Sequence, residues 1–382
     1  MAHTHRQISC FSTQMIPVSE PAIAPESFQK VRECLISGWI SGSSQYVAEF
    51  EKIFAASTGA RYGVSVSSGT AALHLSCVAL GIGVGDEVIV PNLTIISCAL
   101  APIYCRATPV LVDVDTETGN LDPSEVEKVI TARTKAILVV HLLGHPADMA
   151  RLIQIARKHK IHIIEDCAEA HGALYKNRMV GTLGTLGIYS FYANKIVTTG
   201  EGGMIVTNSK NLYKKMVSLR NLAHSPTKRF FHRTIGFNYR LSGLQAALGI
   251  GQLSRFKEYV KKKREVARLY TSLLQDIPHL RLPKEKPYAK SVYWMYSVLL
   301  QSSARMSRST FMKKLQARRV ETRTFFYPLH MQPAIKKMFV VRTDLPISSR
   351  LARQGLYIPS GLTLSEQDIR SVARAIRETL PA

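Results

Sequence analysis

Between about residue 60 and residue 210, short β-branched runs alternate with helical patterns, and this alternation limits the possible folds more than any other feature. The apolar runs span 86–91, 108–115, 135–142, 161–166 and 202–208, with helical patterns that include 70–80 and 148–159. Such runs are typical of parallel strands that are buried on both faces and joined by crossover helices. We therefore expect a doubly wound α/β sheet that binds ligands at the carboxyl ends of its strands.

After about residue 240 the pattern changes. We expect a long helix, a mixed segment and two further helices, at 241–275, 291–300, 308–318 and 365–380. These elements indicate a smaller α+β domain. The predicted division is a large α/β domain over 15–250 and a small C-terminal α+β domain over 251–382.

The chain is strongly basic. Its 382 residues contain 50 Lys and Arg against 27 Asp and Glu, which gives a formal net charge of +23. The excess is partly local, because residues 202–257 contain no acidic side chain. A charge of this size suggests anionic partners such as phosphorylated small molecules, nucleic acid or a membrane surface.

The cysteines and the N-terminus indicate the compartment. The six cysteines form no CxxC pair and no Cys/His cluster at zinc spacing, so we expect reduced thiols and no metal site: Cys10, Cys34, Cys77, Cys98, Cys105 and Cys167. The first residues lack the apolar core of a signal peptide, and no run reaches the ~18 apolar residues of a membrane span. We expect a cytoplasmic protein without a transmembrane segment.

One lysine, Lys195, lies in the segment SFYANKIVTTGEGG (190–203), where small residues let the backbone approach a ligand closely. A buried lysine has a lowered pKa, and its neutral amine can form a Schiff base with a carbonyl group. If that carbonyl belongs to pyridoxal phosphate, the ring nitrogen needs a carboxylate. The phosphate then needs backbone N–H groups at a helix start, together with hydroxyls.

The sequence has candidates for these needs at a strand end, before an apolar helix and near the lysine: Glu165, Asp166 and Glu169; the segment SVSSGTAALHL (65–75); and Ser190. Taken alone, a strand-end carboxylate or a Ser-Gly-Thr sequence is usually a helix cap, and a lysine is usually exposed. Their joint order along an α/β pattern indicates a cofactor site. The glycine-rich GTLGTLG (181–187) fits no nucleotide-binding motif.

Six segments match one family in order: GWISGSSQYVAEFE (38–51), SSGTAALHLSCVALGIGVGDEVIVP (67–91), ATPVLVDVD (107–115), EDCAEAHGA (165–173), SFYANKIVTTGEGGM (190–204) and GFNYRLSGLQAALGIGQL (236–253). Over roughly residues 15–380 the chain resembles the sugar-nucleotide aminotransferases of the DegT/DnrJ/EryC1/StrS family. The resemblance implies pyridoxal phosphate as the cofactor and fold type I, a mainly parallel doubly wound sheet with a smaller C-terminal α+β domain.

The resemblance also implies roles for single residues. Lys195 would bind the cofactor covalently and move the proton, and Asp166 would pair with the pyridine nitrogen. Glu169 would lie near the phenolic oxygen of the ring. The residues implied for the phosphate are Gly69, Thr70 and Ser190.

Two further positions bear on the cofactor. Asn238, in GFNYR, matches an asparagine that reaches the phosphate from the neighbouring subunit, which implies a homodimer with shared active sites. Ile95, in PNLTI, stands where the family commonly has an aromatic residue stacked on the cofactor. An aliphatic side chain packs on the ring but stacks less specifically.

Within the family, the chain most resembles the GDP-perosamine synthases, which aminate C4 of GDP-4-keto-6-deoxymannose for lipopolysaccharide O-antigen. The segment ETRTFFYPLHMQP (321–333) carries much of this similarity and in the family lies beside the sugar-nucleotide site. We therefore expect substrate contacts from Ser41, Arg323, Tyr327 and His330. Tyr327 stands where GDP-perosamine synthases tend to have histidine.

The expected reaction moves an amino group from L-glutamate to a nucleotide-linked 4-keto-6-deoxy sugar. Three alternatives stay open. One is a UDP- or dTDP-linked keto sugar as substrate. Another is the family's 3-dehydratase branch, against which Lys195 argues because that branch has histidine there. The third is a non-catalytic, nucleic-acid-binding or regulatory descendant, which the charge would suit, although no recognised nucleic-acid module is present. We expect no specific nucleic-acid partner.

Overall fold

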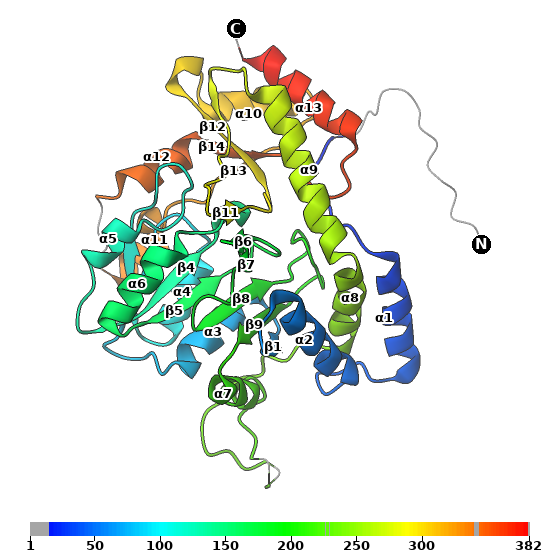
Figure 1. The fold of residues 1–382 in the computed structure, drawn as a ribbon, viewed down its shortest axis with the longest axis vertical. Helices are drawn as coiled ribbons and strands as arrows, with labels where there is room; N and C mark the ends of the chain where they lie inside the picture. The colour runs from blue at the N-terminus through cyan, green and yellow to red at the C-terminus, as the bar shows by residue number, and fades with distance from the viewer. Residues whose placement is uncertain (1–14, 226, 229, 340–343, 381–382) are drawn as a thin grey trace.

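A seven-stranded sheet forms the centre of the computed structural model, which describes residues 15–225, 227–228, 230–339 and 344–380 (Figure 1). The order is β1-β9-β8-β5-β4-β2-β3. The bounds are β1 Tyr62–Val66, β2 Glu87–Pro91, β3 Thr108–Val112, β4 Thr134–Val140, β5 His162–Asp166, β8 Leu186–Ser190 and β9 Gly203–Thr207. Strands β8, β5, β4, β2 and β3 are parallel, so the mainly parallel α/β sheet is confirmed.

Strand β9 is the exception, because it runs antiparallel to both β8 and β1. The expectation that 202–208 is a parallel strand is therefore wrong. Parallel neighbours need a long crossover connection, usually a helix, whereas residues 191–202 form a loop without a helix. That loop reverses the chain at the sheet edge and carries Lys195.

Helices cover the sheet on both faces. In the larger part of the molecule they are α1 Pro25–Ser37, α2 Gln45–Thr58, α3 Gly69–Ala79, α4 Ser97–Tyr104, α5 Pro123–Glu127, α6 Met149–His159, α7 Lys210–Arg220 and α8 Gly243–Ser254. Phe54 of α2 packs its ring on Tyr189 of β8, and Gly69 of α3 lies against the next residue, Ser190. Since neighbouring strand residues point to opposite faces, α2 and α3 cover opposite faces. The helices predicted at 70–80 and 148–159 are confirmed.

The C-terminal part has its own antiparallel sheet, in the order β10-β12-β14-β13 (Figure 1, top). Its elements are α9 Phe256–Leu274, β10 Leu280–Arg281, β12 Tyr296–Leu300, α10 Arg308–Ala317, β13 Arg323–Thr324, α11 Pro333–Met338, α12 Pro346–Gln354, β14 Gly355–Ile358 and α13 Glu366–Thr379. A separate apolar cluster lies between α9, α10, α13 and this sheet. The domain boundary at 250 stays a prediction, and it falls inside α8.

The long helix expected over 241–275 is two helices, α8 and α9, which meet at Arg255. The Arg255 guanidinium lies 2.8 Å from Glu26 at the start of α1 and 3.2 Å from Glu258. Residue 251 of α8 must be glycine, because an added Cβ would lie 2.3 Å from the backbone of Ser27. These contacts fix α8 against α1 and account for the change of direction before α9.

A short three-stranded sheet of β6 Leu174–Tyr175, β7 Arg178–Met179 and β11 Ala289–Lys290 joins the two parts.

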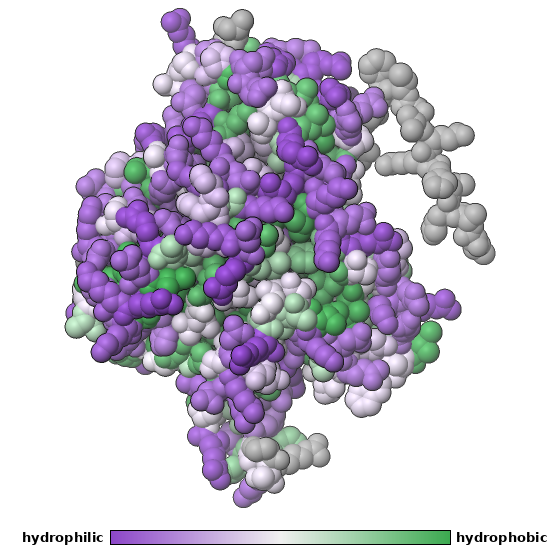
Figure 2. Space-filling view, viewed as in Figure 1, coloured by the Kyte–Doolittle hydropathy of each residue, from purple (hydrophilic) through white to green (hydrophobic). Residues whose placement is uncertain are grey.

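The chain between α7 and α8 projects away from the large domain (Figure 1, bottom), and Ile235 there is 83% exposed. Figure 2 shows a mostly hydrophilic face with apolar residues exposed on the side of α1, where Ile36 is 76% exposed. None of the helices described here combines the length and the apolar character needed to cross a bilayer.

Candidate active site

A cavity of about 310 Å³ opens at the carboxyl ends of β4 and β5, beside the loop that follows β8. Its lining brings together most of the residues that the sequence suggested for the cofactor: Gly69, Thr70, Ile95, Asp166, Glu169, Ser190 and Lys195. They come from different strands and helix starts. The parallel sheet brings them together because its strands end at one edge.

Lys195 is held in this cavity with its side chain only 11% exposed. Its Nζ lies 3.7 Å from the ring centroid of Trp294 and 4.0 Å from Glu169 Oε1. Burial lowers the pKa of Lys195, while the charges of Glu169 and Asp166 oppose that shift. A lowered pKa increases the fraction of neutral amine, which is the form that attacks a carbonyl.

The two carboxyl groups of the cavity are destabilised as anions. Burial raises the pKa of Glu169 to about 7, although Lys195 and the Leu143 N–H, 2.8 Å from Oε2, favour the ionised form. Leu143 lies in the 3₁₀ turn Leu142–Gly144 after β4. Burial also raises the pKa of Asp166, against the hydrogen bonds that Ala168 and Cys98 donate. Burial therefore disfavours the anion of each group, and a cation placed beside it would favour that anion.

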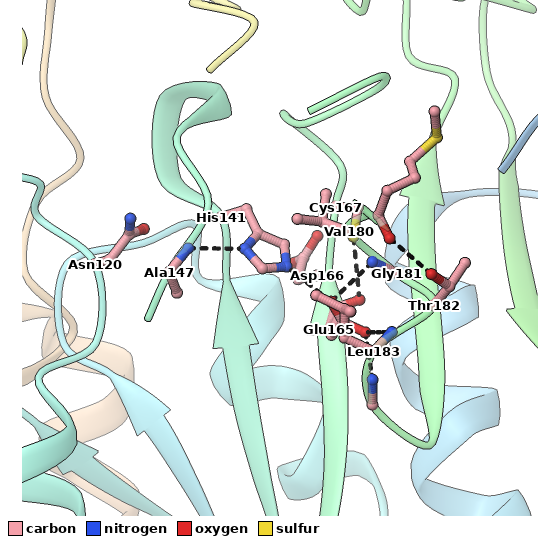
Figure 3. A network of polar contacts seen from close by, with 12 residues as sticks. Asn120, His141, Ala147, Glu165, Asp166, Cys167, Val180, Gly181, Thr182 and Leu183 are labelled. Carbon is pink, nitrogen blue, oxygen red and sulfur yellow. Dashed lines mark hydrogen bonds and ion pairs between the residues drawn. The ribbon is translucent and has the colours of Figure 1, made fainter. Parts of the chain in front are cut away.

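Glu165 and Asp166 have different roles because successive strand residues point to opposite faces. Asp166 lines the cavity, whereas Glu165 points away and is fully buried. Figure 3 shows Glu165 in a polar network with His141 and the loop after β7. His141 Nδ1 accepts from Ala147 N–H at 3.0 Å, so its Nε2 donates to Glu165 at 3.1 Å.

The segment GTLGTLG has a structural role in this network. Its backbone N–H groups at Gly181, Leu183 and Gly184 donate to Glu165 at 2.5–2.8 Å. Gly187 is required for close approach, since a Cβ there would lie 2.2 Å from the Gly181 carbonyl oxygen. The network holds the strand that carries Asp166 by its opposite face. Glu165 and His141 are thus hydrogen-bonded within the protein, and Cys167 lies beside them.

The N-terminal end of α3 forms a cradle for an anion. Ser68 caps the helix through Ala71 N–H at 3.1 Å, which leaves the N–H groups at the helix start facing the cavity. A Cβ at Gly69 would meet the Ser190 side chain at 3.0 Å, so glycine keeps this space open. Thr70 Oγ1 and Ser97 Oγ lie 2.8 Å apart and add hydroxyls.

The remaining predicted residues do not line this cavity. Asn238 is exposed and accepts from Arg240 at 2.8 Å, and Ser41 is exposed beside Ser43. Arg323 is exposed and pairs with Glu321 at 3.3 Å. Tyr327 lines a second pocket of about 410 Å³ that also contains Arg308 and Lys313, so it lies apart from the cofactor cavity.

His330 is buried against the large domain rather than open to a ligand. Its backbone N–H donates to Asn92 Oδ1 at 2.9 Å, and its Nδ1 accepts from Asn92 Nδ2 at 2.8 Å. Burial lowers its pKa. These two hydrogen bonds join His330, in the segment before α11, to Asn92, the residue that follows β2. A role in substrate binding remains a prediction for it, as for Ser41, Arg323 and Tyr327.

Sequence reasoning missed several side chains of the cavity. Trp294 covers Lys195 and donates from Nε1 to the Asn194 carbonyl at 2.9 Å. Trp294 lies in the segment expected as mixed structure at 291–300, and only the fold brings it back to Lys195. Ser97 had a usable signal, a hydroxyl at a helix start. Cys98, a buried neighbour of Asp166, had none.

The residues present fit pyridoxal phosphate. The cavity offers an amine, a buried carboxylate and an anion cradle that a Cβ would fill. Asn194 Oδ1 is buried without a hydrogen-bond partner among the described residues, as expected of a polar atom that faces a ligand space. The exposed fraction of Ile95 is 41%, and its side chain lines the same cavity.

Comparisons with known proteins identify the family of the chain. Residues 21–377 match the DegT/DnrJ/EryC1/StrS aminotransferase family. The chain is 41% identical to a GDP-perosamine synthase of Caulobacter vibrioides (96% of this chain, 98% of that protein) and 39% identical to one of Escherichia coli O157:H7 (95% and 98%). It is 25% identical to the PLP form of Spr1654, a putative sugar aminotransferase from Streptococcus pneumoniae (TM-score 0.89, 96% and 100%).

The raised pKa of Glu169 predicts a dependence of stability on pH in the protein freed of cofactor. The folded carboxyl group keeps its proton up to about pH 7, whereas the unfolded group loses it near 4.5. The free energy of unfolding should therefore fall as pH rises from 4.5 to 7, by on the order of 2–3 kcal/mol from this group. Urea unfolding at a series of pH values measures the slope.

Glu169→Gln should lose this part of the slope, because an amide does not titrate. Glu49→Gln, on the exposed side of α2, is the matched control and should keep it. An unchanged slope in Glu169→Gln would contradict the assignment.

Proposed function

The chain belongs to the DegT/DnrJ/EryC1/StrS aminotransferase family, and we propose that it moves the amino group of L-glutamate to C4 of GDP-4-keto-6-deoxymannose, which gives GDP-perosamine. The chain is a sugar aminotransferase with pyridoxal phosphate as cofactor. The observation that carries the proposal is the meeting of Lys195, Asp166 and Glu169 with the start of α3 in one cavity.

When bound, pyridoxal phosphate withdraws the electrons that are left on a substrate carbon when that carbon loses its proton. The buried carboxylate of Asp166 would pair with the ring nitrogen and keep that nitrogen protonated. The neutral amine of Lys195 would take the proton from the substrate carbon and deliver it to the carbon on the other side of the transferred nitrogen. Burial lowers the pKa of Lys195, which supplies this neutral amine.

Other residues hold and shield the reactants. The N–H groups at the start of α3, with Thr70 and Ser190, would hold the phosphate. Glu169, whose pKa burial raises to about 7, would lie near the phenolic oxygen of the ring. Trp294 and Phe326 line the cavity with apolar surface and exclude water from the amine of Lys195.

The substrate assignment rests on the segment after β13. Phe326 lines the cofactor cavity, while the next residue, Tyr327, and Thr324 line the second pocket, of about 410 Å³, with Arg308 and Lys313. A substrate that enters along this segment meets cations suited to a diphosphate. Arg323 is exposed, and its 3.3 Å ion pair with Glu321 is screened by solvent, so its guanidinium can turn toward such an anion.

The homodimer is also proposed. Asn238 lies at the base of the projecting chain between α7 and α8 and does not line the cavity of its own chain. Arg240 holds the Asn238 carboxamide oxygen at 2.8 Å, and Ile235 is 83% exposed. A projecting segment with exposed apolar residues suits contact with a second copy, in which Asn238 would reach the partner's phosphate site.

A comparison of nucleotide sugars tests the substrate. Purified protein with pyridoxal phosphate and L-glutamate is offered the GDP-, UDP- and dTDP-linked 4-keto-6-deoxy sugars, and amino-sugar products are measured by mass spectrometry. We expect the highest kcat/KM with GDP-4-keto-6-deoxymannose. Lys195→Ala, the blank, should give no product. Preference for a UDP or dTDP sugar would overturn the perosamine assignment, and no product from any sugar would overturn the proposed function.

Subunit mixing tests the shared site. Lys195→Ala and Asn238→Ala homodimers should each be inactive, since each lacks one component at both sites. After subunit exchange, a mixed dimer has one site with both components, so up to about a quarter of parental activity should return in an equal mixture. Native mass spectrometry confirms the exchange. Exchange without recovered activity would mean that each site is built within one chain.

A further inference from the structure

The thiol of Cys98 contacts the carboxylate of Asp166 from behind the cofactor cavity. Its Sγ lies 3.2 Å from Asp166 Oδ2, and both side chains are buried. Cys98 belongs to the first turn of α4 and Asp166 ends β5, so the contact links two elements that are 68 residues apart. The proposed reaction assigns no role to the Cys98 thiol.

The thiol is the donor in this contact. Burial and the negative charge of Asp166 raise the pKa of Cys98 well above its ordinary value, so the group keeps its proton. On its other side, Thr94 Oγ1 lies 3.5 Å from the sulfur. With the S–H directed at Asp166, the sulfur can accept from the Thr94 hydroxyl. Thr94, Cys98 and Asp166 thus form a short chain of hydrogen bonds.

The Asp166 carboxylate is held at both oxygens by donors from different elements. Ala168 N–H donates to Oδ1 at 2.9 Å, and the Cys98 thiol donates to Oδ2. Two donors fix the plane of the carboxylate. They also favour its ionised form, which burial disfavours. A carboxylate that must pair with a protonated ring nitrogen needs both properties.

We propose that Cys98 is a positioning residue that orients the Asp166 carboxylate and keeps it ionised for the ring nitrogen of pyridoxal phosphate. The inference rests on the proposed function, since it takes Asp166 as the partner of that nitrogen. A thiol that only filled space would serve as well without its S–H group. The decisive comparison is therefore between variants that keep a donor and variants that lose it.

Three variants separate these roles. Cys98→Ser keeps a donor of similar size, and Cys98→Ala removes it. Cys167→Ala, the matched control, removes another buried thiol one residue from Asp166, whose Sγ lies near the Glu165 carbonyl oxygen at 3.9 Å. The charge of Lys195, which also acts on Asp166, is the same in all three.

The readouts do not depend on turnover. Apoenzyme is titrated with pyridoxal phosphate, and the Kd is followed by absorbance from pH 5 to pH 8. The infrared S–H stretching band of Cys98, assigned by its loss in Cys98→Ser, is compared between apoenzyme and holoenzyme. Thermal unfolding of each apoenzyme reports on packing alone.

We expect Cys98→Ala to weaken cofactor binding by about tenfold, the effect of one lost hydrogen bond to a charged group. Its loss of affinity on the acid side should begin at a higher pH, because the Asp166 pKa rises further without the donor. Cys98→Ser should stay within about threefold of the parent and keep the parental pH profile. The S–H band should shift when the cofactor binds. Cys167→Ala should keep the parental Kd.

Equal Kd values and pH profiles in the parent and Cys98→Ala would overturn the inference. Equal losses in Cys98→Ser and Cys98→Ala would also overturn it, since packing would then explain both. Asp166→Asn distinguishes this failure from failure of the proposed function. If Asp166→Asn weakens cofactor binding and Cys98→Ala does not, only the inference fails. If Asp166→Asn binds as the parent does, the role of Asp166 fails, and the inference with it.

Discussion

The burial of three ionisable groups in one cavity is the constraint on which the rest of the site depends. Lys195, Glu169 and Asp166 lose water on folding, and burial shifts the pKa of each toward its neutral form. Burial of such groups costs free energy unless neighbouring groups bind them. The Leu143 N–H on Glu169, the Ala168 N–H on Asp166 and the Trp294 ring over Lys195 supply that support. The cavity is therefore ready for an ionic, covalently attached ligand.

Several residues that do not line the cavity hold the end of β5 in place. Glu165 points away from Asp166 and binds His141 together with the backbone of the GTLGTLG loop (Figure 3). Glycines in that loop allow the close approach of two backbone segments. On the other side, Cys98 closes against the Asp166 carboxylate. The strand end is thus held from both faces, which fixes the position of the Asp166 carboxylate in the cavity.

Much of the fold and of the site was predictable because the signals are local. Strand runs, Ser-capped helix starts and the segment around Lys195 each carry their pattern in a few residues, and the parallel sheet brings their ends together. The direction of β9 was not predictable from its own apolar run, since the loop before it decides that direction. Trp294 and Cys98 also escaped prediction, because their contacts with Lys195 and Asp166 exist only after folding. The bridging bonds of His330 to Asn92 were missed for the same reason. Of the six cysteines expected to be reduced thiols, Cys10 lies outside the residues that the structure describes.

The most direct test of the account is the identity of the lysine that holds the cofactor. Holoenzyme is reduced with borohydride, digested and mapped by mass spectrometry. The account predicts a pyridoxyl group on the peptide that contains Lys195, and Lys195→Ala should give no labelled peptide. Labelling of a different lysine in the parent, or a parent that stays unlabelled with cofactor bound, would contradict the central claim that the buried Lys195 is the reactive amine of this site.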